Sequence, residues 1–132
     1  MWLRRLILAG MLALASCQNE AERREVLPMT LGVHRRLNVE NMPAEEYPEE
    51  YKRLGLKRAR RALYQQGEAK ILATVYEMAS PAVAFEMVQK WRPEPGKLVF
   101  HQGPFFVVLA STPENQKPMN ELAQHLEQVL KR

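Results

Sequence analysis

The chain has 132 residues, enough for one domain, and carries 19 Lys and Arg against 15 acidic residues, a formal net charge of +4. Its single cysteine excludes an intrachain disulfide, a thiolate zinc site and a Cys-x-x-Cys redox pair. All fifteen acidic residues are glutamate, which excludes an EF-hand loop with Asp ligands and the Asp of a Ser-His-Asp triad. We expect a non-catalytic protein without a metal or cofactor.

The first residues have the pattern of an export signal. Arg4 and Arg5 precede the uncharged run LILAGMLALA, which is followed by a small-residue processing site at Ala15 and Ser16. The run is much shorter than the roughly 20 residues that a membrane-spanning helix needs. The pattern therefore predicts a signal peptide, and a transmembrane anchor is the weaker interpretation.

The quartet Leu14-Ala15-Ser16-Cys17 resembles a bacterial lipobox. The resemblance implies cleavage between Ser16 and Cys17 and acylation of Cys17, and two acyl chains suffice for stable membrane anchoring. Gln18, in place of Asp, favours the outer over the inner membrane under the sorting rule of enteric-type bacteria. An ordinary secretory signal with a chance cysteine is the alternative.

The predicted organisation is a signal peptide (1–16), a lipidated N-terminus and tether (17–25) and a single domain (26–132). The tether is polar, and eight flexible residues have an end-to-end distance of about 15 Å. We therefore expect a periplasm-facing domain of the bacterial cell envelope, held close to the bilayer.

The first half of the domain predicts strands separated by a short helix. Pro48 at a helical first turn and Gly55 as a stop indicate the helix, and Gly67 indicates a hairpin turn. The segment 69–78 is rich in β-formers and is the best candidate for a central strand. The expected elements are a short strand within 26–37, a helix at 48–54, and strands at 56–65 and 69–78.

The second half predicts a helix, a hairpin and a last helix. Ser80 is a typical N-cap with Pro81 in the first helical position, and apolar residues recur at helical spacing up to Trp91. The expected elements are a helix at 80–91, strands at 97–102 and 105–111, and a helix at 116–131. The order predicts an α+β fold, an antiparallel sheet of about four to five strands with two main helices on one face.

Four segments resemble, in this order, an uncharacterised family of bacterial envelope domains. They are VLPMTLG, EEYPEEYKRLG, ILATVYEMASPAVAFEMVQKW and HQGPFFVVLAS, which together cover most of residues 26–130. The resemblance implies the fold and an envelope setting, and it implies no active site.

Residues that could carry catalysis are scattered. His34, His101 and His125 lie far apart and outside the metalloprotease patterns. His101 could lie at a pocket rim, so a hydrolase that uses His101 and a glutamate is the weakest of three functional hypotheses.

A basic run that includes Arg58, Arg60 and Arg61 could contact anionic lipid headgroups, because the tether would hold the domain near a membrane. A charged solvent face is the alternative. The predicted compartment argues against nucleic acid as a partner.

Phe105 and Phe106 are adjacent in one predicted strand, so they cannot both face the same side of the sheet. One of them could form an exposed apolar patch, which favours the first hypothesis, a binding or assembly module that meets another envelope protein. The second hypothesis is a carrier of a small hydrophobic ligand. Its pocket between sheet and helices would be lined by Tyr76, Phe85, Trp91 and Phe100.

Overall fold

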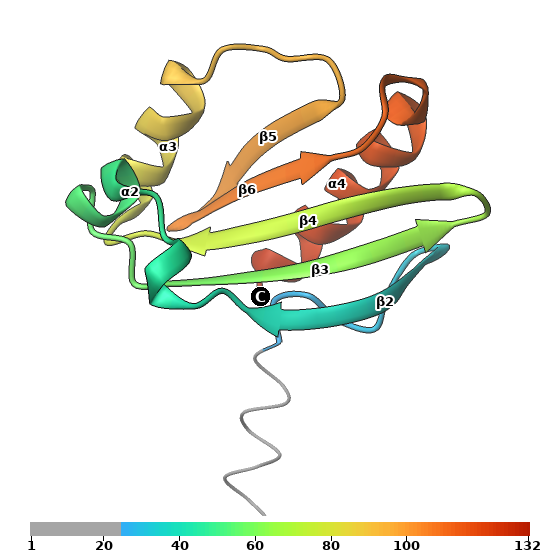
Figure 1. Cartoon of the computed structure of the whole chain (residues 1–132), viewed down its shortest axis with the longest axis horizontal. Coiled ribbons are helices and arrows are strands. Elements are labelled where there is room, and N and C mark those ends of the chain that lie inside the picture. Colours follow the sequence, from blue (N-terminus) through green and yellow to red (C-terminus); the bar gives the residue numbers. More distant parts are fainter. Residues whose placement is uncertain (1–24) are drawn as a thin grey trace, which may run out of the picture.

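A computed structural model describes residues 25–132 as a curled antiparallel sheet with helices (Figure 1). The predicted signal peptide, cleavage site and Cys17 anchor lie outside the described residues. The elements are β1 (Thr30–Leu31), β2 (His34–Asn41), η1 (Ala44–Glu46), α2 (Glu49–Arg53), β3 (Arg58–Gln66), β4 (Ala69–Glu77), α3 (Pro81–Lys90), β5 (Lys97–Gln102), β6 (Phe105–Ala110), η2 (Pro113–Asn115) and α4 (Gln116–Leu130).

The sheet has six strands in the order β1-β2-β3-β4-β6-β5, and every neighbouring pair is antiparallel. The α+β class is confirmed, but the predicted count of four to five strands is too low. The segment expected to form one short strand contains β1 and continues into the longer β2. The sequence did not predict β2 as a separate strand because it is largely polar. A strand near the edge of a sheet need not alternate between apolar and polar residues.

The prediction that both main helices cover one face of the sheet is wrong. Val107 and Leu109 of β6 pack in the cluster that includes Met119, Leu122 and Leu126 of α4. Their neighbour Phe106 packs with Ala84 and Met87 of α3. Successive side chains of a strand point to opposite faces, so α3 and α4 lie on opposite sides of the sheet. In Figure 1, α4 runs behind the strands, and α2 and α3 gather at the left end.

The apolar sequence of β5 and β6 explains this arrangement. A strand that is buried on both faces reads as a continuous apolar run, and FFVVLA is such a run. Leu98 and Phe100 of β5 contact the α4 cluster, and Val99 contacts the α3 cluster. The domain therefore has two apolar layers, with the β5–β6 pair shared between them.

Helix α3 begins as its sequence predicts. The Ser80 hydroxyl accepts a hydrogen bond from the Val83 N–H at 3.3 Å, and Pro81 occupies the first turn. Helix α4 places Met119, Leu122 and Leu126 on one buried side, at the predicted spacing of three and four.

A candidate ligand-binding cleft

An open cleft of about 830 Å³ lies between one end of the sheet and the C-terminal turn of α4. Its apolar wall combines Val75 of β4, Phe105 of β6, and Val129 and Leu130 of α4. Val75 is buried, whereas Phe105, Val129 and Leu130 are half-buried. The strand register forms one side of this cleft, because it aligns Arg58 at the start of β3, Glu77 at the end of β4 and Phe105 at the start of β6. The last turn of α4 forms the other side.

Arginine and glutamate side chains form the polar part of the cleft. Arg58 and Arg60 alternate along β3 and therefore point to the same face of the sheet. Glu25, Glu77 and Arg132 complete the charged lining. The lining thus carries three guanidinium groups and two carboxylates, beside an apolar wall.

Arg60 is held firmly within this lining. Its Nε donates to Glu25 Oε1 at 2.6 Å, its Nη2 donates to Glu25 Oε2, and its Nη1 donates to Asn41 Oδ1 at 2.8 Å. Asn41 lies directly opposite Arg60 in the β2–β3 register. This bidentate pair joins the first described residue of the chain to the third strand of the sheet.

The pair also changes the titration of its members. Burial alone would raise the pKa of Glu25, but hydrogen bonds from Arg60 and from the Leu27 N–H outweigh burial and lower this pKa. The hydrogen bond to Glu25 raises the pKa of Arg60. Both groups therefore stay ionised at neutral pH.

Arg58 is more accessible to a guest. It pairs with Glu77, its direct neighbour in the β3–β4 register, with 3.2 Å between Arg58 Nε and Glu77 Oε2. The Arg58 side chain is 76% exposed, and exposed ion pairs contribute little free energy. The exposed Arg58 side chain can therefore turn towards an anion in the cleft, while Glu77, which is 20% exposed, stays beside it.

The expected basic surface of Arg58, Arg60 and Arg61 is not formed as one unit. Arg61 lies on the opposite face of β3, where it pairs with Glu40 and, at 2.8 Å, with Glu46. Each of the three arginines has a glutamate partner. Only Arg58 and Arg60 share a face of β3, and contact of these arginines with anionic lipid stays a prediction.

The two adjacent phenylalanines do not form an exposed patch. Phe106 is fully buried and contacts the rings of Tyr51, Tyr76 and Trp91. Phe105 faces the other side and lines the cleft. Phe106 is therefore covered by the α3 side, whereas Phe105 stays half-buried at the edge of the α4 side.

The four residues predicted to line a carrier pocket do not meet in one cavity. Phe100 belongs to the α4 side of the sheet, whereas Tyr76 and Trp91 belong to the α3 side. Phe85 is 46% exposed on α3 and lies against the ring of His101. The observed cleft has a different lining, which sequence reasoning missed because it combines residues from both ends of the domain.

The expectation that all three histidines lie far apart is wrong for one pair, because His125 of α4 lies close enough to His34 of β2 to affect its charge. His101 packs edge-on against Phe85 with 5.3 Å between ring centroids, and its buried Nδ1 has no hydrogen-bond partner. His125 is exposed on α4. Within residues 25–132 no group of three or more His, Cys or Glu side chains is arranged to hold a metal ion.

His34 was not singled out by the sequence, and it is the buried histidine. It is 1% exposed, and neither ring nitrogen has a hydrogen-bond partner. Burial lowers its pKa, opposed by Glu121 and assisted by His125.

Comparison of the chain with protein-family models, curated proteins and solved structures found no match. In the described part of the chain, no helix combines the length and apolar character needed to cross a membrane.

Proposed function

We propose that the chain is a lipid-anchored protein of the bacterial envelope, and that its domain is a non-catalytic module that binds an amphipathic anion in the cleft. The observation that carries the proposal is the 830 Å³ cleft, which sets Arg58 beside the apolar surface of Val75, Phe105 and Leu130. Pockets for small ligands commonly have volumes of about 300–1,000 Å³ and mostly apolar walls with a few polar groups.

The lining favours a guest with one apolar and one anionic part. The apolar wall would remove hydrocarbon from water at about 25 cal/mol per Å² of buried area. A guanidinium group can donate two parallel hydrogen bonds to a carboxylate or phosphate. Arg58 is available for this role because its side chain is 76% exposed.

The proposed lipid anchor at Cys17 would place the cleft close to a membrane. Glu25, which lines the cleft, is eight residues from Cys17. If Cys17 is acylated and residues 18–25 form the tether expected from the sequence, their average end-to-end distance of about 15 Å would hold the cleft near the bilayer. An amphipathic anion near the bilayer, such as a fatty acid or a lysophospholipid, is the expected class of guest.

The anchor is tested on detergent-extracted protein by intact mass. The expected result is loss of residues 1–16 and added acyl mass on Cys17. An unmodified N-terminus would contradict the lipid anchor, but it would not affect the proposal that the cleft binds a ligand.

The cleft is tested by binding of a fluorescent fatty acid to the purified chain. Leu130→Glu places a carboxylate in the apolar wall, and we expect at least tenfold weaker binding. Leu72→Glu is the matched control, because Leu72 is 41% exposed on the opposite face of the sheet. Equal binding by the wild type and both variants would reject the cleft as the site.

A second candidate function is protein assembly through the uncovered part of the sheet. Leu37 and Leu72 are 40% and 41% exposed, and half-buried Leu63 pairs with Leu72 in the β3–β4 register. Crosslinking in the native cells tests this candidate. A partner protein captured by the wild type and lost in Leu72→Glu, but not in Leu130→Glu, would favour assembly.

A hydrolase that uses His101 has less support. The ring of His101 lies against Phe85, and its buried Nδ1 has no hydrogen-bond partner in the described structure. A general base needs an orienting partner and access to substrate. The expected His101–glutamate pair therefore finds no support in this geometry.

A further inference from the structure

A second, smaller cavity of about 200 Å³ lies between α2 and α3, on the side of the sheet opposite the cleft. Phe106 of β6 lies at its base, and Tyr51 of α2 and Trp91 at the end of α3 form aromatic walls. Leu54, Val83 and Met87 complete the apolar lining. The cavity is too small for a drug-sized molecule and suits a single compact group.

The aromatic rings of this cavity hold one another in place. Tyr51 is perpendicular to Tyr76, with ring centroids 4.9 Å apart, and also perpendicular to Phe106, at 6.0 Å. Trp91 lies 6.0 Å from Phe106 at an interplanar angle of 52°. Edge-to-face contacts, such as the two made by Tyr51, stabilise defined ring orientations. The aromatic surfaces are therefore positioned before any guest arrives.

The cavity is also electrostatically suited to a cation. Glu50 and Glu86 line it, against one basic residue, Lys90. Burial, with contributions from Tyr76 and Glu50, raises the pKa of Tyr51 to about 12, so the phenol stays neutral. Trp91 already has a cationic neighbour, because Lys97 Nζ lies 5.9 Å from its ring centroid. Aromatic faces attract cations at this range.

We propose that this cavity binds a compact alkylammonium group, held by cation–π contacts with Trp91 and Tyr51 and balanced by the carboxylates of Glu50 and Glu86. The aromatic surface alone would suit a neutral apolar group equally well. The two glutamates favour the cation, because their side chains give the lining a net charge of −1 even with Lys90 present. The nearby Lys97 does not change this balance, because its ammonium group pairs with Glu94 at 3.2 Å. The site is independent of the cleft, which lies on the other face.

The test is a titration of the full chain with choline, followed by the NMR shift of the Trp91 indole N–H. The neutral carbon isostere of choline, 3,3-dimethylbutan-1-ol, separates charge recognition from apolar packing. We expect choline to shift the Trp91 signal and to bind at least threefold more tightly than the isostere. No shift with choline, or equal affinity for both compounds, would overturn the proposal.

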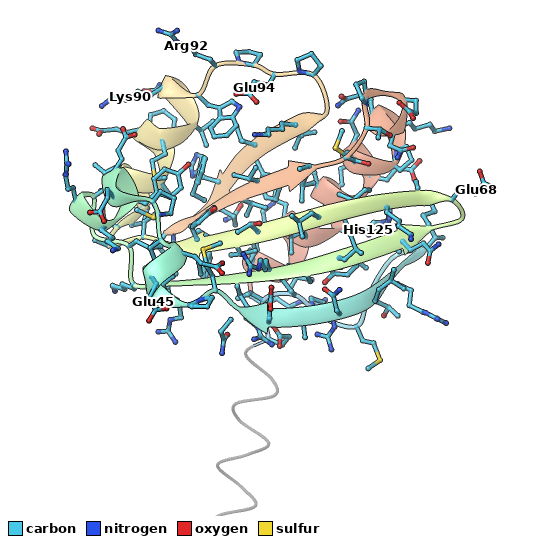
Figure 2. The ribbon with its side chains drawn as sticks, viewed as in Figure 1. Glu45, Glu68, Lys90, Arg92, Glu94 and His125 are labelled. Carbon is cyan, nitrogen blue, oxygen red and sulfur yellow. The ribbon has the colours of Figure 1, made fainter. Side chains whose placement is uncertain are left out.

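Substitutions of exposed charged residues test the binding without disturbing the fold, because Glu86 and Lys90 are both exposed. Glu86→Gln should weaken choline binding about two- to fivefold, and Lys90→Gln should strengthen it by a similar factor. Glu68→Gln is the matched control, since Glu68 is exposed at the β3–β4 turn, far from Lys90 (Figure 2). If Glu86→Gln and Lys90→Gln leave the affinity unchanged, or change it no more than Glu68→Gln, the proposal is wrong.

Discussion

The imidazole ring of His125 packs directly against the backbone of Gly32. A β-carbon on Gly32 would meet His125 Nε2 and would overlap the ring. Gly32 connects β1 to β2, whereas His125 belongs to α4 and is labelled between β3 and β4 in Figure 2. Gly32 also has a φ of +61°, which L side chains rarely adopt. The hairpin can approach α4 this closely only because it has no side chain there.

Gly32→Ala should therefore destabilise the domain by about 2–3 kcal/mol, through backbone strain and overlap with His125 together. Gly67→Ala is the matched control, because Gly67 has a φ of +60° and open space around it. Its cost should be only the backbone part, about 1 kcal/mol. Urea unfolding measures both free energies. The double variant Gly32→Ala/His125→Ala should recover the difference, and equal losses for the two glycine variants would contradict the contact.

His34 should make the domain less stable as the pH falls through the ordinary range of histidine. Its folded pKa lies below the value of 6.5 that it has when unfolded, chiefly because it is buried. The unfolded chain therefore binds a proton first, and stability is lost as the pH falls below about 6.5 towards the folded pKa. Of the charged groups near it, Glu121 opposes the shift and His125 adds to it.

The free energy of unfolding, measured between pH 7.5 and 5.5, tests this prediction. The wild type should lose stability as the pH falls across this range, with a slope of at most about 1.4 kcal/mol per pH unit for one titrating group. His34→Leu should flatten the dependence, because it removes the buried titrating group. A variant whose pH profile matches that of the wild type would show that another residue causes the loss.

The pair between Glu25 and Arg60 should stabilise the domain, because it ties the start of the described chain to β3. Both side chains are about three-quarters buried, at 24% and 27% exposure. Glu25→Gln should cost about 1–2 kcal/mol at pH 7, since it weakens a charge-assisted bidentate contact. Glu49→Gln is the control, because Glu49 is 76% exposed in its pair with Lys52 and should change stability by less than about 0.5 kcal/mol.

The same pair predicts a second loss of stability in acid. The pKa of Glu25 is lowered from 4.5, so its contribution is present above that pH and is lost as the pH falls through the folded value. Thermal unfolding at pH 5 and pH 3 should show a smaller decrease for Glu25→Gln than for the wild type. Parallel decreases would assign the acid sensitivity to other carboxylates.

Ser80→Ala should destabilise α3 by about 1 kcal/mol, because the Ser80 hydroxyl accepts the Val83 N–H that the helix itself leaves unpaired. Ser80→Asp should keep most of the stability, since its carboxylate also accepts this bond and favours the helix N-terminus. Thermal unfolding compares the two variants. Equal melting temperatures for Ser80→Ala and Ser80→Asp would argue against a capping role.

Local signals in the sequence were sufficient for the elements with well-defined ends. Ser80 and Pro81 mark the start of α3, and the spacing of Met119, Leu122 and Leu126 marks the buried side of α4. These signals act within a few residues, through capping hydrogen bonds and helical periodicity. The hairpin turn at Gly67 is likewise local, because it depends on a backbone conformation that glycine adopts freely.

Only the tertiary structure decided which face each helix covers and where a cavity forms. The run FFVVLA is compatible with burial on one or both sides, and only the positions of α3 and α4 show that both are covered. The cleft joins Glu25, Arg58 and Leu130, which are far apart in the chain and meet through strand register and helix packing. Long-range register and packing leave no local signal, whereas caps and periodicity do. That difference explains why the sequence alone determined the helices and the α+β class but not the binding surfaces.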